Sequence, residues 1–356
     1  MNSNQFKDIV TSLIQKGVEV EQDALQVAQS KLALKSIIIR VISVIGSLIG
    51  LGLFMGFIAL ISSDLFSNNT FLSIMGLLFL VGSFALNRSK DSAVTDSIAV
   101  SLFIIGYAFL VFGLSEATDL AGLIMLITGG ITLLLYNNQI IAFLSSLCVL
   151  VSIHVILFQL EIEAFYHIYL AIVLLFTVYL FWQEQGLRTI NKLIRDRYLA
   201  VFTASFCYTL VMGIIASTMK YGYYYFSEYR GVHLFLVITI LALVVATVYL
   251  VLNKMKVTQV SIKVMVYGLV LIFNVLIAFN YPAFGIAFLL MLWSFKRQYK
   301  VGFALSIATL IWAMGMFYYD LGISLLEKSL SMMGIGVLFL GIYYLIQKGE
   351  GQTNEK

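Results

Sequence analysis

Long apolar segments separated by short polar loops run through most of this 356-residue sequence. A membrane-spanning helix needs about 20 apolar residues to cross a hydrocarbon core of about 30 Å. The segments are continuous and do not alternate at every second residue, so they predict helices and not barrel strands. Hydrophobic residues make up 61% of the chain and charged residues 11%, against about 45–50% and about 25% in soluble domains. Water-soluble classes are therefore excluded, and we expect an all-α, polytopic transmembrane helix bundle.

The apolar segments predict about twelve spans. They lie at 41–62, 70–86, 98–113, 120–136, 140–158, 165–182, 198–218, 232–252, 264–279, 283–295, 301–318 and 330–346. Only Asn280, Tyr281 and Pro282 separate the ninth span from the tenth. Because proline interrupts a helix and restricts the residue before it, we expect a tight hairpin there. One long kinked span is the alternative, and it would move the C-terminus to the other side of the membrane.

The chain divides into three parts by composition. Residues 1–36 are polar and amphipathic, and they predict short cytoplasmic helices. Residues 37–346 form the transmembrane domain, and residues 347–356 form a cytoplasmic tail. Within the transmembrane domain, Gly46 with Gly50, Gly52 with Gly56, and the pair Gly129–Gly130 predict close helix packing.

Basic residues lie almost entirely in alternate loops. Of the 22 Lys and Arg residues, the loops of one side hold all but Lys220, Arg230 and Lys328. The positive-inside rule places this basic side, and both termini, in the cytoplasm. The opposite face is acidic, with Asp64, Glu116, Asp119, Glu161, Glu163, Glu228, Asp320 and Glu327. We therefore expect a multi-pass membrane protein with both termini in the cytoplasm.

The connection after the fifth span carries imidazole and carboxylate groups. They belong to His154, Glu161, Glu163 and His167. These groups are ligands for zinc, but their spacing matches no compact metal motif. Hydrogen bonding at the membrane boundary is the alternative interpretation, so the four residues are only weak metal candidates. We expect no cofactor.

Two outer loops combine aromatic and charged residues. The first contains Tyr224, Glu228 and Arg230, and the second contains Tyr319, Asp320, Glu327 and Lys328. Aromatic rings belong at the lipid–water boundary, and exposed charges often form weak salt bridges. The alternative is that these seven residues form an outer surface that binds a partner or a ligand.

The segment around the last outer loop resembles a known family. It reads Tyr318-Tyr319-Asp320-Leu321, then Leu325-Leu326-Glu327-Lys328-Ser329, before a glycine-bearing final span. This pattern, together with the amphipathic N-terminal segment and the glycine-rich first span, is similar to the domain-of-unknown-function family 4401 of bacterial membrane proteins. The resemblance implies a polytopic protein of the bacterial cytoplasmic (inner) membrane that is encoded near a second membrane protein, and hence a membrane complex.

The sequence favours a non-enzymatic membrane subunit or scaffold whose partners are the lipid bilayer and a second membrane protein. Nucleic acid is not expected as a partner. No Asp or Glu lies in the middle of an expected span, which argues against an ion-coupled relay. A transporter or flippase for a lipid-linked or small neutral substrate is the alternative function, and an intramembrane enzyme is the least favoured.

Overall fold

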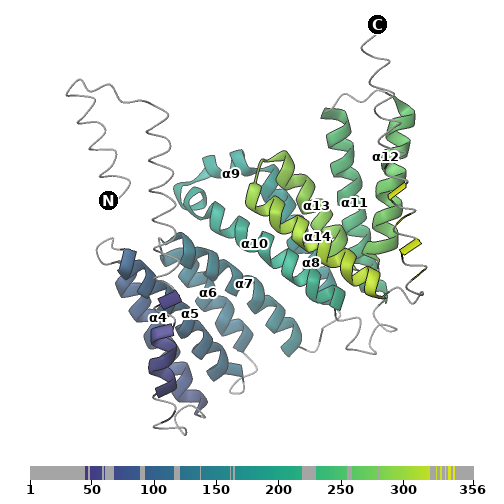
Figure 1. The fold of residues 1–356 in the computed structure, drawn as a ribbon. Coiled ribbons are helices and arrows are strands. Elements are labelled where there is room, and N and C mark those ends of the chain that lie inside the picture. Colours follow the sequence, from purple (N-terminus) through teal and green to yellow (C-terminus); the bar gives the residue numbers. More distant parts are fainter. Residues whose placement is uncertain are drawn as a thin grey trace, which may run out of the picture. The chain divides into compact units, whose positions relative to one another are not determined.

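The computed structural model describes residues 49–57, 68–88, 93–115, 121–136, 138–160, 165–218, 230–254, 259–279 and 281–320, with single residues or pairs elsewhere. In the described part between residues 69 and 320, twelve helices follow one another (Figure 1), which confirms the all-α class. They belong to two compact units. The first unit is Met1–Glu163 with Gln185–Ala204, and the second is Ala164–Glu184 with Ser205–Lys356.

The first unit is built from helix pairs that are consecutive in the sequence. It contains α4 (Asn69–Asn87), α5 (Ala93–Ser115), α6 (Ala121–Leu135), α7 (Gln139–Gln159), most of α9 (Glu184–Ile190) and the start of α10 (Lys192–Thr218). Packing is most extensive between α4 and α5 and between α6 and α7. Asparagine side chains fix where α4 and α7 begin. Asn68 Oδ1 accepts from the backbone N–H of Thr70 at 3.0 Å, and Asn138 Oδ1 accepts from that of Ile140 at 2.9 Å.

Glycines allow the backbones of α4 and α5 to approach closely. A Cβ atom added at Gly76 would lie 2.6 Å from the backbone nitrogen of Leu110 and 2.8 Å from the carbonyl oxygen of Gly106. One added at Gly113 would lie 2.6 Å from the backbone nitrogen of Ser73. Small residues are favoured at helix contacts in lipid because dispersion contacts and not hydrophobic exclusion hold the helices together.

The second unit surrounds one central helix. It contains α8 (Tyr166–Trp182), the rest of α10, α11 (Arg230–Lys254), α12 (Val260–Phe273), the π-helical segment η4 (Asn274–Ala278), α13 (Pro282–Lys296) and α14 (Lys300–Asp320). Of these, α13 packs against α8, α11, η4 and α14 (Figure 1). Ten of its 15 residues are buried. A helix that is apolar all round is suited to this central position.

The expected number of twelve spans is wrong. Among the described residues, six helices are long and apolar enough to cross a membrane, namely α4, α5, α7, α10, α11 and α14. A seventh is added if α8 and α9 are one broken span. The helices α6 and α13 have 15 residues and α12 has 14. At 1.5 Å per residue, 15 residues rise only about 22 Å, less than the core of about 30 Å. The chain is therefore a multi-pass membrane protein with six or seven candidate spans in its described part.

Two of the twelve expected spans are not covered by this comparison. Of the segment 41–62 the structure describes residues 45–46, 49–57 and 60, all helical, and of the segment 330–346 only residues 330, 333, 336–337 and 340. The amphipathic segment 1–36 and the tail 347–356 lie outside the described residues. A Cβ atom added at Gly46, Gly50, Gly52 or Gly56 would have no described atom within 4 Å, so the close packing expected at these glycines is not observed among the described residues.

The expected helix break at Pro282 is present. Proline is the first residue of α13, a position where its missing N–H is not needed. Before it, the backbone N–H of Tyr281 donates to the carbonyl of Ile277 at 2.8 Å and closes the turn after η4. One helical segment therefore ends before Pro282 and another begins there, and the tight hairpin itself stays a prediction.

Candidate functional site

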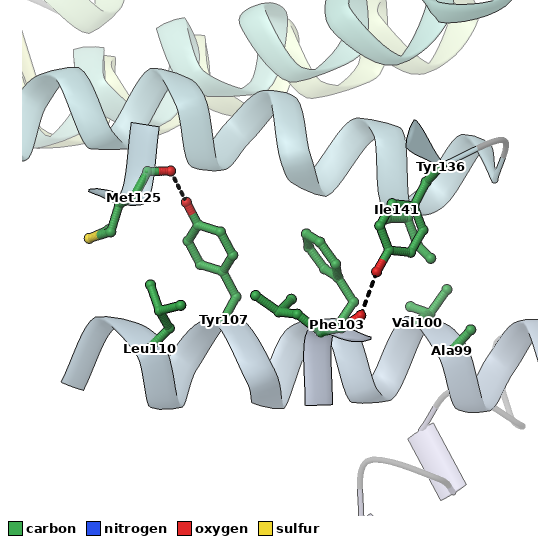
Figure 2. Packing of buried hydrophobic residues seen from close by; sticks show 9 residues of the cluster. Ala99, Val100, Phe103, Tyr107, Leu110, Met125, Tyr136 and Ile141 are labelled. Carbon is green, nitrogen blue, oxygen red and sulfur yellow. Dashed lines mark hydrogen bonds between the residues drawn. The ribbon is translucent and has the colours of Figure 1, made fainter. Parts of the chain in front are cut away.

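Buried hydroxyl groups join the helices of the first unit. The Tyr107 hydroxyl donates to the carbonyl of Met125 at 2.7 Å, and the Tyr136 hydroxyl donates to the carbonyl of Leu80 at 2.8 Å (Figure 2). Ser83 donates in the same way to the carbonyl of Ala99 at 2.7 Å. The tyrosines belong to an apolar cluster with Phe103 and its neighbours. These hydrogen bonds connect helix to helix, so the polar groups stabilise the packing of this unit.

The residues of the weak metal site are divided between two elements. His154 lies in α7 of the first unit, and His167 lies at the start of α8 in the second unit. Glu161 and Glu163 are outside the described residues. Among the residues that the structure describes, no three His, Cys, Asp or Glu side chains are grouped to hold a metal ion. Since half of the four-residue set lies outside that part, the metal hypothesis stays a prediction.

Three residues of the predicted outer surface are described. Tyr319 and Asp320 end α14, with Tyr319 80% exposed and Asp320 half-buried, and Arg230 begins α11. The other four, Tyr224, Glu228, Glu327 and Lys328, lie outside the described residues. An exposed tyrosine followed by an acid at the end of an apolar helix is typical of the lipid–water boundary.

The most distinctive polar group of the second unit is Asn274. It is 1% exposed and begins the π-helical segment η4. Its Nδ2 donates to the carbonyl of Val270 at 3.0 Å, and its buried Oδ1 accepts no hydrogen bond from any residue that the structure describes. A buried acceptor without a donor costs about 1–3 kcal/mol. Single π-helical turns often occur at functional sites, so the cost identifies Asn274 as a candidate functional residue.

Gly285 brings the backbone of α13 close to this amide. A Cβ atom added at Gly285 would lie 3.3 Å from Asn274 Oδ1 and 2.5 Å from Cγ2 of Ile240. Any larger residue at Gly285 would therefore push α13 away from η4 and α11. The helix break thus holds the buried amide oxygen of Asn274 against the buried backbone of α13.

A serine from a distant helix caps the start of α13. The hydroxyl of Ser217 in α10 accepts from the backbone N–H of Ala283 at 3.1 Å and donates to the carbonyl of Gly213 at 2.9 Å. Tyr281, which precedes α13, provides no side-chain cap. The sequence carried no signal for this role, because Ser217 is 66 residues from its partner. Asn274, by contrast, has a signal in the sequence, because it is an amide within the expected apolar span 264–279.

The sequence comparisons identify one family. Residues 37–348 match the family described as a domain of unknown function, DUF4401. The chain belongs to the DUF4401 family. This membership confirms the resemblance seen in the sequence, and the matched region includes all twelve described helices from α4 to α14. No curated protein and no solved structure matches the chain.

Charged side chains of this DUF4401 protein lie at helix ends. In the described helices, every Asp, Glu, Lys and Arg of an apolar helix lies in its first two turns or its last turn. The charged residue that lies farthest from a helix end is Arg197, the sixth residue of α10. Arg197 donates from Nη2 to the carbonyl of Leu134 at 3.3 Å, at the end of α6. The polar groups in the interior of these helices are therefore neutral.

Proposed function

We propose that this DUF4401 protein is a non-enzymatic subunit or scaffold of a complex in the bacterial cytoplasmic (inner) membrane. The observation that carries the proposal is the confinement of charge to helix ends. Proton and ion relays place ionisable residues inside the bundle, where desolvation makes them costly. Here the buried hydroxyls of the first unit instead hold helices together. Such a bundle is suited to presenting a fixed surface to another membrane protein.

The proposed orientation has both termini in the cytoplasm. It follows from the excess of Lys and Arg in alternate loops and from the positive-inside rule. The partner surface is then the outer one, formed by Tyr319 and Asp320 at the end of α14 together with Glu327, Lys328, Tyr224, Glu228 and Arg230. Exposed aromatic residues with interspersed charges are typical of protein interfaces.

Recovery of the partner tests this proposal. The tagged full-length protein is purified in native lipid, and we expect a stoichiometric second membrane protein to accompany it. Asp320→Asn combined with Lys328→Gln should lower partner recovery several-fold without changing expression or thermal stability. Asp96→Asn, which removes a carboxylate from the first turn of α5, is the matched control and should retain full recovery. Full recovery with the double variant would refute the proposed surface, and absence of any partner would refute the proposed function.

One observation favours a second function, transport of a lipid-linked or small neutral substrate. Discontinuous helices with neutral polar groups form substrate sites in several transporter folds. The break between η4 and α13, with Asn274 and Gly285 facing each other, is such a feature. Uptake of labelled glucose into proteoliposomes provides a first test. The wild type should exceed empty liposomes, and Asn274→Ala should abolish the difference. Uptake equal to that of empty liposomes would exclude this neutral sugar as a substrate.

A further inference from the structure

Four helix ends meet on one side of the second unit. Here α8, α11 and α13 finish and α14 begins, and α13 packs against the other three (Figure 1). Trp293 Nε1 donates to Thr247 Oγ1 at 3.0 Å, which joins the last turns of α13 to α11. Beyond this hydrogen bond both helices end in a lysine, Lys254 and Lys296. The two ammonium groups therefore leave the packed core from neighbouring helix ends.

Two cations at this end are held by defined contacts. Lys296 Nζ lies 4.5 Å from the centre of the Trp293 ring. Arg297 Nη2 donates to the carbonyls of Phe181 at 2.6 Å and Trp182 at 3.1 Å, so it satisfies acceptors at the end of α8. Its Nη1 lies 3.8 Å from Glu184 Oε2. Both side chains therefore have restricted positions without a bound ligand.

Positive charge exceeds negative charge in this cluster. The described ends of these helices carry four cations, Lys254, Lys296, Arg297 and Lys300, and one acid, Glu184, which pairs with Arg297. The other acid among the described residues of the second unit, Asp320, lies at the far end of α14. Partial burial, and then the charges of Arg297 and Lys254, lower the pKa of Lys296 from its ordinary value. The protein thus holds cations close enough to disfavour one another. A bound anion would relieve this repulsion.

Exposed aromatic rings flank the cluster. Trp182, whose carbonyl binds Arg297, is 66% exposed, and Phe295, beside Lys296, is 72% exposed. Large rings with this exposure at the end of an apolar helix belong at the boundary between acyl chains and headgroups. Basic clusters between helices on the cytoplasmic side are suited to anionic headgroups. An anion here would therefore be attached to acyl chains.

We propose that Lys254, Lys296 and Arg297 form a binding site for the phosphate of an anionic phospholipid headgroup. Arg297 and Lys296 supply N–H donors from fixed positions, and Lys254 supplies a third donor from α11. Trp182 and Phe295 contact the adjoining acyl chains. The site is independent of the outer partner surface, because it involves the opposite helix ends.

Lipid binding is measured on the full-length protein in phosphatidylcholine nanodiscs, with fluorescent phosphatidylglycerol as the probe. The combined change Lys254→Gln and Lys296→Gln removes two cations and leaves Arg297, which the end of α8 requires. We expect affinity for phosphatidylglycerol to fall roughly tenfold or more, because each cation near an anionic headgroup contributes about 1 kcal/mol. The lipid-dependent rise in Tm should be lost as well.

The matched control removes equal charge from the first unit. Lys192→Gln with Arg195→Gln, at the start of α10, should leave phosphatidylglycerol affinity unchanged. An equal fall in both double variants would mean general charge attraction and would overturn the site. Inorganic phosphate is the second arm. It should neither stabilise the protein nor compete with the lipid, and competition at comparable concentration would overturn the assignment to a lipid.

Discussion

The hydroxyl of Tyr107 connects α5 to α6, since it donates to the carbonyl of Met125 at 2.7 Å. The ring is buried in the apolar cluster, so the hydroxyl has no water to bond with if this contact is lost. Tyr107→Phe keeps the ring and removes the hydrogen bond. We expect the free energy of unfolding to fall by about 0.5–1 kcal/mol, because interhelical hydrogen bonds in lipid average about 0.6 kcal/mol. Unfolding in a detergent titration measures the change.

Tyr249→Phe, at a position 57% exposed, is the control and should have no effect. Equal loss in both variants would show that the hydroxyl of Tyr107 does not stabilise the packing.

The loop between α13 and α14 depends on one residue with an unusual backbone. Gln298 has a φ of 56°, in the left-handed region that glycine adopts most readily. Its N–H donates to the carbonyl of Phe295 at 3.1 Å, and that of Tyr299 donates to the carbonyl of Ser294 at 2.9 Å, which together form a Schellman motif. Because glycine avoids the Cβ strain, Gln298→Gly should raise the free energy of unfolding by about 0.5–1 kcal/mol. A thermal unfolding scan in detergent tests this, with Gln298→Ala as the control that keeps the Cβ atom. If Gln298→Gly is no more stable than Gln298→Ala, backbone strain at this position is not significant.

The orientation of the whole molecule is set by charge, and labelling can test it. In a variant lacking Cys148 and Cys207, single cysteines are placed at Asn191, before α10, at Asn253, in the last turn of α11, and at Ser227, between the two helices. Cysteines at Asn191 and Asn253 should be shielded from an impermeant thiol reagent in intact cells, because the basic loops remain in the cytoplasm. The cysteine at Ser227 should react. Permeabilised cells, in which all three should react, provide the control. Labelling of Asn191 with protection of Ser227 would reverse the proposed orientation.

Much of the fold could be predicted from the order of the residues. Composition alone excludes a soluble protein, and the continuous apolar runs predict the helices that the structure contains. Pro282 predicts where α13 begins, because a proline, which has no N–H to donate, is tolerated best in the first turn of a helix. The close packing expected at Gly129 is confirmed, since an added Cβ would lie 3.1 Å from Cγ2 of Val149. These properties depend on a residue and its near neighbours in the chain, which the sequence displays directly.

Tertiary structure decided the lengths of those helices and which residues of different helices come into contact. The sequence predicted twelve spans, because hydropathy also marks apolar helices such as α6, α12 and α13, which have only 14 or 15 residues. It does not distinguish Gly76, which contacts α5 through its backbone, from Gly130, which has no described atom within 4 Å of an added Cβ. Ser217 caps a helix that begins 65 residues later, and the charge of Lys254 acts on Lys296 because α11 packs against α13. Such contacts join residues that are distant in the chain, and an apolar sequence permits many packings of the same helices. The sequence by itself therefore determined the class and the helices, whereas close packing between helices decided which polar and basic groups come together.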